Sequence, residues 1–238
     1  MKEYINIGND PDKTIPAILW GDSGDRMMIA VHGDLSNKED TIIELLARTL
    51  IPKGYRVLSF DLPEHGERKN REYVCNPQNC ISDLQAVDAY ARSISTDISL
   101  FACSIGAYFS LLAFPTHDIR KFFLLSPIIN MENVIQNMMA GFQVSEQRLR
   151  DEKKILLPIG KTLDWDYYTY VRQHPVDSNL NSAIAVLYGS KDTLTTQEEI
   201  MVFSEKNQAV LTIMEGGEHF FSSNKQLSFF EAWLNENL

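Results

Sequence analysis

The sequence lacks any apolar stretch long enough to cross a membrane. No uninterrupted run of about 18 apolar residues occurs in its 238 residues. The first ten residues, MKEYINIGND, carry charges where a signal peptide has its apolar region. We therefore expect no membrane span and a cytoplasmic location.

Cysteine is scarce, and its count is odd. The 3 cysteines cannot all pair, and a protein without an export signal is expected to keep its thiols reduced. A bridge between Cys75 and Cys80 is conceivable, but a metal site there would need further ligands, and no second Cys-x-x-Cys or nearby histidine pair supplies them. We expect reduced cysteines and no metal site.

Positive charge is also in short supply. The chain has 22 Lys and Arg against 32 Asp and Glu, a net charge of −10, and no basic run that would bind nucleic-acid phosphates. It contains neither G-x-G-x-x-G nor H-E-x-x-H, and Gly160-Lys161-Thr162 has Ile155 where a P-loop needs its first glycine. We expect no cofactor and no nucleic-acid partner, and the missing glycine-rich loop also counts against a flavodoxin-like phosphate binder.

What the sequence has is a regular alternation of short apolar runs and amphipathic stretches. The pattern predicts strands at residues 26–31, 55–60, 98–103, 121–126, 183–188 and 210–214. It predicts helices at residues 40–50, 82–94, 105–114 and 196–206, and a closing helix through 229–234. Runs so continuously apolar are typical of strands buried on both faces, so the prediction is an α/β fold with a mostly parallel sheet between helices.

The alternation stops between residues 130 and 178. This stretch is rich in Met, Gln and Asn, ends with an aromatic cluster at 165–170, and contains no strong strand. An insertion after the carboxyl end of a strand lies above the sheet edge where ligands bind in open α/β folds. We therefore predict a core of residues 1–129 and 179–238, with a small helical cap at 130–178.

The most informative short segment is Ala102-Cys103-Ser104-Ile105-Gly106, where a predicted strand runs into a helix. A serine on such a turn is exposed for nucleophilic attack, in the arrangement called a nucleophile elbow. Ala102 occupies the first glycine position of the usual G-x-S-x-G pattern. A serine at this position is also an ordinary helix cap, so the segment alone leaves both interpretations open.

A catalytic serine needs a histidine to take its proton and an acid to orient that histidine. Asp192 follows one predicted strand and His219 follows the next. Parallel strands end on the same edge of a sheet, so these loops can converge on Ser104. Glu218 is a rival to Asp192, but a direct sequence neighbour of His219 rarely reaches the Nδ1 atom of its ring.

These segments together resemble the α/β-hydrolase family, and within it small bacterial esterases, monoacylglycerol-lipase-like and serine-aminopeptidase-like hydrolases. The resemblance spans nearly the whole chain and is carried by Val31-His32-Gly33, an Asp61–Gly66 segment similar to D-x-x-G-H-G, the Ser104 elbow, Tyr188–Asp192 and His219. It implies the α/β-hydrolase fold with a small helical cap. It also implies a cofactor-independent serine hydrolase with Ser104 as nucleophile, His219 as base and Asp192 as the orienting acid.

The resemblance further implies an oxyanion hole made by the backbone N–H groups of Ile105 and Asp34. In the cap, Met138, Trp165 and Tyr168 are candidates for lining a substrate pocket, or they pack the cap onto the core.

Two other residues near these motifs are expected to be structural. His65 follows a strand that precedes the elbow, where the family does not place its base. Cys103 ends its strand and is expected to point away from the tip of the elbow and to pack in the core.

The three candidate catalytic residues do not select a substrate. The same chemistry cleaves esters, thioesters, peptides and certain carbon–carbon bonds, and a non-catalytic small-molecule-binding protein on the same fold is a further alternative. The sequence favours a carboxylesterase acting on small or medium acyl or aryl esters, as a monomer or homodimer.

Overall fold

An eight-stranded sheet runs through the centre of the computed structural model, which describes residues 1–8, 13–115, 119–176 and 180–238. The strand order is β1-β2-β4-β3-β5-β6-β9-β10. Strand β2 pairs antiparallel with both β1 and β4, whereas all other neighbours are parallel. The strands are β1 (Lys2–Ile7), β2 (Ile15–Trp20), β3 (Arg26–Val31), β4 (Tyr55–Phe60), β5 (Asp97–Cys103), β6 (Lys121–Leu125), β9 (Ala183–Gly189) and β10 (Val210–Met214).

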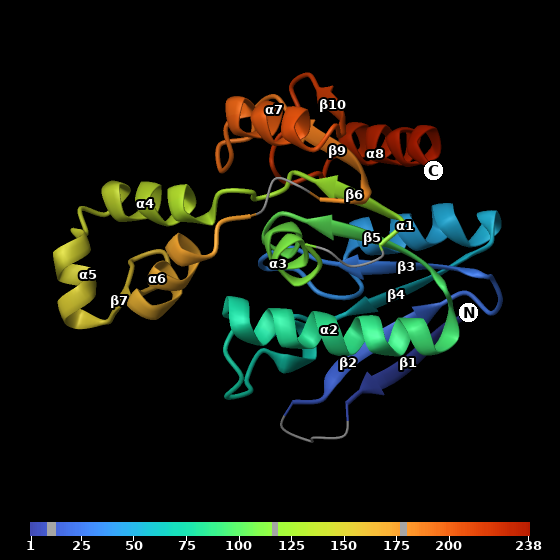
Figure 1. The fold of residues 1–238 in the computed structure, drawn as a ribbon, viewed down its shortest axis with the longest axis horizontal. Helices are drawn as coiled ribbons and strands as arrows, with labels where there is room; N and C mark the ends of the chain where they lie inside the picture. The colour runs from blue at the N-terminus through green and yellow to red at the C-terminus, as the bar shows by residue number, and fades with distance from the viewer. Residues whose placement is uncertain (9–12, 116–118, 177–179) are drawn as a thin grey trace.

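Helices cover both faces of this sheet (Figure 1). One face carries α2 (Pro77–Ile94), α3 (Ile105–Ala113) and α7 (Gln197–Lys206), and the other carries α1 (Thr41–Leu50) and α8 (Asn224–Asn237). The short 3-10 helices are η1 (Ile51–Lys53) and η2 (Gly66–Arg68). Within the described ranges, none of the helices combines the length and the apolar character that a membrane crossing needs.

The continuous apolar runs follow from burial on both faces. In β3, Met27, Ile29 and Val31 belong to the core under α2 and α3, while Met28 and Ala30 belong to the core under α1 and α8. Side chains alternate along a strand, so a strand covered on both sides needs apolar residues at successive positions. The predicted parallel strands are confirmed to within one residue at each end.

Three features of the fold were not predicted from the pattern. The pattern predicts no secondary structure at β1 and β2, and it predicts the start of α2 near residue 82, whereas the helix begins at Pro77. The start of α2 is set by Asn76, whose side chain accepts the N–H of Asn79 at 2.8 Å, and by a proline at the first helical position.

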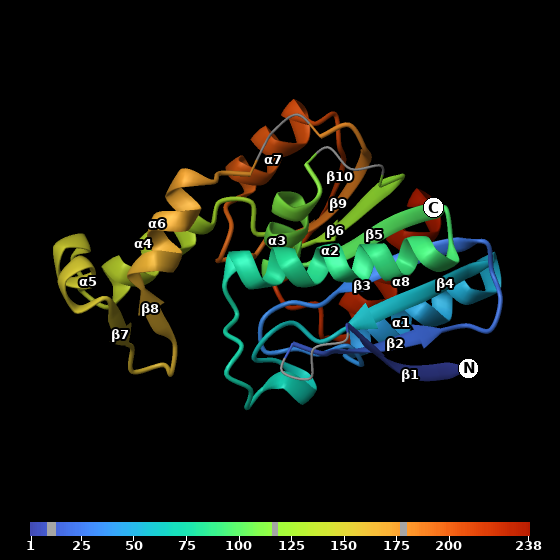
Figure 2. The ribbon, with the colours of Figure 1, turned by 60° about the horizontal axis from the view of Figure 1, so that its bottom comes forward.

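A segment between β6 and β9 stands apart from the large sheet, beyond the carboxyl ends of its strands (Figures 1 and 2). We call residues 130–176 the β6–β9 segment. The helical content is as expected, but the small β7–β8 hairpin was not predicted. The predicted boundary at 178 lies outside the described residues, and the division into core and cap stays a prediction. The segment's elements are α4 (Met131–Gly141), α5 (Glu146–Glu152), β7 (Lys154–Leu156), β8 (Thr162–Asp164) and α6 (Trp165–Gln173).

A buried carboxylate, Asp61, holds together two loops at the carboxyl edge of the sheet. It accepts hydrogen bonds from Lys38 N at 2.9 Å, Lys38 Nζ at 2.7 Å and Glu67 N at 3.0 Å. Although burial opposes it, hydrogen bonds to Asp61 and Glu67 hold the pKa of Lys38 above its usual value. Gly66 has φ +50°, and a Cβ there would lie 2.3 Å from the Asp61 carboxylate. The Asp61–Gly66 segment is thus explained by loop packing.

We expect Asp61→Ala to lower the free energy of unfolding by about 3–5 kcal/mol, because the variant leaves a buried ammonium group without its main partner. Urea denaturation followed by circular dichroism measures this change. Glu152→Ala is the matched control: it breaks a pair with Arg148 whose two side chains are about half exposed, and it should change stability little. Equal effects of the two substitutions would contradict the role given to Asp61.

Candidate active site

Ser104 lies at the sharp turn between β5 and α3. Its backbone has φ 50° and ψ −120°, a conformation that residues other than glycine rarely adopt. Two backbone hydrogen bonds hold the turn, from Ser104 N to Leu125 O at 3.1 Å and from Ile128 N to Ser104 O at 3.2 Å. Such strain costs on the order of 1–3 kcal/mol and is concentrated at functional sites.

Small residues allow the chain to pack closely around this turn. A Cβ at Gly106 would lie 2.4 Å from the carbonyl oxygen of His32, and one at Gly33 would lie 3.2 Å from Ser104 Cβ. Ala102 is fully buried in the apolar core. The elbow therefore accommodates a methyl group at the first glycine position of the usual pattern, while the second glycine is required by contact with β3.

The structure brings Ser104, His219 and Asp192 into one hydrogen-bonded row. His219 Nε2 lies 2.8 Å from Ser104 Oγ, and His219 Nδ1 lies 2.6 Å from Asp192 Oδ2. Because a carboxylate only accepts hydrogen bonds, Nδ1 carries the proton of a neutral ring and Nε2 accepts from the serine hydroxyl. The side chains of His219 and Asp192 are 5% and 0% exposed.

The loop after β9 fixes the orientation of the carboxylate. The other oxygen of Asp192, Oδ1, accepts the backbone N–H groups of Leu194 at 2.8 Å and Thr195 at 3.3 Å. Glu218, the rival acid in the sequence, is exposed. The aspartate thus has one oxygen held by backbone and the other facing the imidazole.

The N–H groups of Ile105 and Asp34 have no acceptor among the residues that the structure describes. Ile105 is the first residue of α3, where the N–H has no partner within the helix. Asp34 follows Gly33, which packs against Ser104. Both groups are therefore available for a ligand atom near Ser104.

The side chain of Asp34 is held from two sides. Its Oδ1 lies 3.3 Å from Nε2 of His65, and its Oδ2 accepts from Nζ of Lys161, a residue between β7 and β8. Burial works against ionisation, but the hydrogen bonds from His65 and Lys161 lower the pKa of Asp34 to about 2. This contact joins the β6–β9 segment to the loop beside Ser104 and has no signal in the sequence.

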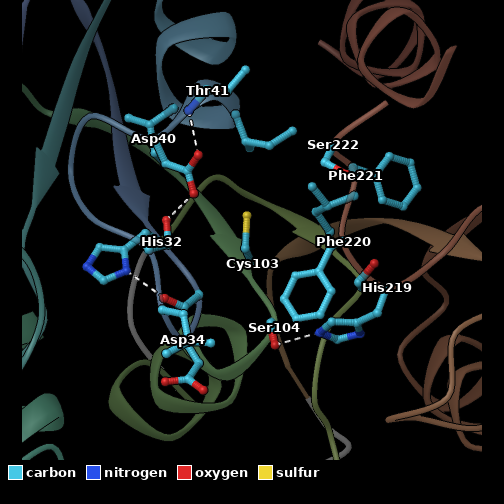
Figure 3. Close-up of a pocket in the computed structure, with 17 residues that line it drawn as sticks. His32, Asp34, Asp40, Thr41, Cys103, Ser104, His219, Phe220, Phe221 and Ser222 are labelled. Carbon is cyan, nitrogen blue, oxygen red and sulfur yellow. Dashed lines mark hydrogen bonds between the residues drawn. The ribbon is translucent and has the colours of Figure 1, made fainter. Parts of the chain in front are cut away.

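A cavity of about 260 Å³ opens beside Ser104 and His219 (Figure 3). It extends towards the N-terminus of α1, with Asp40 and Thr41 at that side and Phe220 and Phe221 opposite. Further described residues that line it include Leu35, Ser36, Ile42, Ile43, Cys103, Leu125 and Ser222.

The surroundings of Ser104 differ from the sequence expectations at Cys103. Cys103 lines this cavity and is half-buried, so it does more than pack in the core. Met138, Trp165 and Tyr168 are not among the described residues that line the cavity; Tyr168 is buried and its hydroxyl lies 3.2 Å from Gln136 within the β6–β9 segment. Their place in a substrate pocket stays a prediction.

Comparison with known sequences is uninformative, because no family model and no curated protein matches the chain. Solved structures are similar over almost the full length. Est1E from Butyrivibrio proteoclasticus has a TM-score of 0.79 at 18% identity, covering 98% of this chain and 98% of its own. The esterase Pf2001 from Pyrococcus furiosus has a TM-score of 0.74 at 18% identity, covering 99% of this chain and 89% of its own.

A mouse protein, alpha/beta hydrolase domain-containing protein 10, has a TM-score of 0.78 at 12% identity and covers 100% of this chain and 98% of its own. At such identities the likeness concerns the fold and not the activity. The sheet order, the helices on both faces and these neighbours agree with the fold that the sequence predicts. This chain has the α/β-hydrolase fold.

Proposed function

We propose that this protein is a serine hydrolase that cleaves carboxylic esters through an acyl-enzyme intermediate. The observation that carries the proposal is the single histidine that bridges a strained serine and a buried carboxylate, at 2.8 Å and 2.6 Å. This is the arrangement in which a neutral imidazole activates a hydroxyl nucleophile.

In the first step, Ser104 Oγ attacks the ester carbonyl carbon while its proton moves to His219 Nε2. The imidazolium that forms is stabilised by Asp192, which also keeps the ring in the tautomer that accepts the serine proton. His219 then gives the proton to the alcohol oxygen, the carbon–oxygen bond breaks, and an acyl group is left on Ser104. In the second step, His219 takes a proton from water as the water oxygen attacks the acyl carbon. His219 then returns this proton to Ser104 Oγ, the bond between the acyl carbon and Oγ breaks, and the carboxylic acid leaves.

The backbone N–H groups of Ile105 and Asp34 would bind the negative oxygen of each tetrahedral intermediate. Preorganised donors of this kind are worth about 2.7–4 kcal/mol each in transition-state stabilisation. The N-terminus of α3 adds its positive end in the same place. The hydrogen bonds of Asp34 to His65 and Lys161 support this role because they fix the loop that carries one donor.

The cavity favours a small or medium acyl or aryl ester. Its volume of about 260 Å³ lies just below the range of pockets that enclose whole drug-sized ligands. The space therefore suits one side of an ester, with the other side directed out of the cavity. Apolar side chains such as Ile42 and Phe221 favour an uncharged substituent.

We expect Ser104→Ala to reduce turnover of short p-nitrophenyl esters by about 10⁶-fold, to background, because the nucleophile is lost. Labelling by a fluorophosphonate should disappear with it, while the melting temperature stays close to that of the unchanged protein. Ser93→Ala, which removes an exposed hydroxyl that donates to Tyr90 O on α2, is the control for both readouts. Turnover that survives loss of Ser104 would contradict the mechanism.

Asp192→Asn should lower kcat by about 10⁴-fold, because an amide nitrogen facing Nδ1 favours the wrong tautomer of His219. Steady-state kinetics at fixed pH measure the change. Glu218→Gln removes the charge of the neighbouring exposed carboxylate and should leave kcat nearly unchanged. If the two variants exchange these behaviours, Glu218 and not Asp192 is the orienting acid.

The other reactions open to these residues are separate outcomes of a substrate screen. Faster turnover of thioesters, peptides or carbon–carbon substrates would replace the ester assignment but keep the three roles. A non-catalytic binding protein would behave differently: ligands would raise its melting temperature equally in the unchanged protein and in Ser104→Ala, without covalent labelling.

A further inference from the structure

A second group of reactive side chains lies outside the cavity, at the N-terminus of α2. Cys75 directly precedes the helix cap Asn76, Cys80 lies in the first turns of the helix, and their Sγ atoms are 3.7 Å apart. Apolar side chains often pack between these two positions and fix the direction in which a chain enters a helix. Packing thus accounts for the contact between the sulfurs, but not for the charge that surrounds them.

A charged histidine faces the first of these cysteines. Nδ1 of His65 lies 2.7 Å from Pro63 O and Nε2 lies 3.3 Å from Asp34 Oδ1. Both neighbours only accept hydrogen bonds, so both ring nitrogens carry protons. Burial opposes the charge, yet the contacts with Asp34 and Pro63 and the negative charge of Cys75 raise the pKa of His65 to about 10. His65 is therefore an imidazolium at neutral pH.

The two sulfurs differ in acidity. The hydrogen bond from Cys80 lowers the pKa of Cys75, and the neighbouring His65 lowers it further, to about 6. Burial works in the opposite direction. Burial and the neighbouring thiolate raise the pKa of Cys80 well above its usual value. Cys75 is half-buried and Cys80 is fully buried. A partly accessible thiolate thus touches a protected thiol.

The third cysteine is a natural contrast. Burial raises the pKa of Cys103 far above that of an ordinary thiol, and Asp40 raises it further. Among the described residues, no second sulfur and no cation is recorded beside it. Cys75 and Cys103 are both half-buried, so the difference in their reactivity follows from their thiolate character. The three cysteines should therefore react at very different rates.

We propose that Cys75 and Cys80 form a peroxide-sensitive dithiol, with Cys75 as the attacking thiolate and Cys80 as the resolving thiol. Cys75 Sγ attacks one oxygen of hydrogen peroxide, the oxygen–oxygen bond breaks, and hydroxide leaves and becomes water by taking a proton from solvent. The sulfenic acid on Cys75 is then attacked by Cys80 Sγ, which loses its proton as a second water is expelled. The two sulfurs are oxidised by two electrons to a disulfide, and the peroxide is reduced to two waters.

The position of this pair links it to the loop beside Ser104. His65 is the shared partner of Cys75 and Asp34. Disulfide formation removes the negative charge of Cys75, so His65 loses one of the groups that keep it protonated and its hold on Asp34 weakens. This consequence rests on the proposed function, because it matters for turnover only if Asp34 contributes to the oxyanion hole.

The first test follows the sulfurs themselves in the full chain. The reduced protein is treated with an equimolar amount of hydrogen peroxide at neutral pH, the remaining thiols are alkylated under denaturing conditions, and the peptides are analysed by mass spectrometry. We expect one product, in which Cys75 and Cys80 are linked with the loss of two hydrogens, and we expect dithiothreitol to reverse it. Cys103 should stay alkylated throughout. Equal oxidation of all three cysteines, or none, would overturn the proposal.

Single variants assign the roles within the pair. In Cys80→Ser, oxidation should stop at a sulfenic acid on Cys75 that dimedone traps. His65→Gln should slow oxidation of Cys75 by about threefold or more, because the neighbouring cation is gone. His174→Gln is the matched control, since the ring of His174 stacks on Tyr170 and bonds to its carbonyl oxygen, and no contact of this ring with a sulfur is recorded among the described residues. An unchanged rate in His65→Gln, with the fold intact by circular dichroism, would remove His65 from the proposal.

A turnover measurement separates this proposal from the proposed function. Peroxide should lower kcat for a p-nitrophenyl ester by about 2- to 30-fold, the range typical of coupling through intermediate residues, and dithiothreitol should restore it. Cys75→Ser should make turnover insensitive to peroxide. If no ester is hydrolysed at all, the hydrolase proposal fails while the disulfide is still observed. If the disulfide forms without a change in kcat, the coupling to Asp34 is wrong.

Discussion

Close packing of α3 against β3 is the constraint on which the region around Ser104 depends. A Cβ at Gly106 would meet the carbonyl oxygen of His32 at 2.4 Å, so the helix sits as near the strand as backbone allows. This contact forces the chain to turn sharply at the end of β5, which places Ser104 in its strained conformation. It also brings the loop after His32 beside the serine, so one contact positions the nucleophile and a candidate donor together.

The loops after β9 and β10 complete the site. Asp192 and His219 follow neighbouring parallel strands, and their side chains meet because those strands end at the same edge. Buried polar groups then hold the loops, as Asp61 does: its carboxylate is fully buried and accepts three hydrogen bonds. Apolar packing determines the arrangement of the sheet, and paired charges fix the conformation of the loops at its carboxyl edge.

The sequence predicts the parallel strands well because burial on both faces requires continuous apolar runs, as in β3. It fails at β1, where only Ile7 is buried and the run carries charges, and at β2, which has no helix after it to complete a recognisable unit.

The row of Ser104, Asp192 and His219 is predicted from strand ends alone. By contrast, the contact of Lys161 with Asp34 joins residues 127 positions apart through the loop of a hairpin whose strands have three residues each, and no local pattern encodes it. The cavity is equally hidden, because it is formed by loops whose side-chain directions depend on packing.

The two small residues of the elbow are not equivalent. The methyl group of Ala102 is enclosed by apolar core, whereas no side chain fits at Gly106. A motif written as G-x-S-x-G requires glycine at both positions, so it does not match this chain. A motif that admits any small residue two positions before the serine, and insists on glycine two positions after it, expresses the actual steric requirement. Chains with alanine at the first position are then as credible, on structural grounds, as those with glycine.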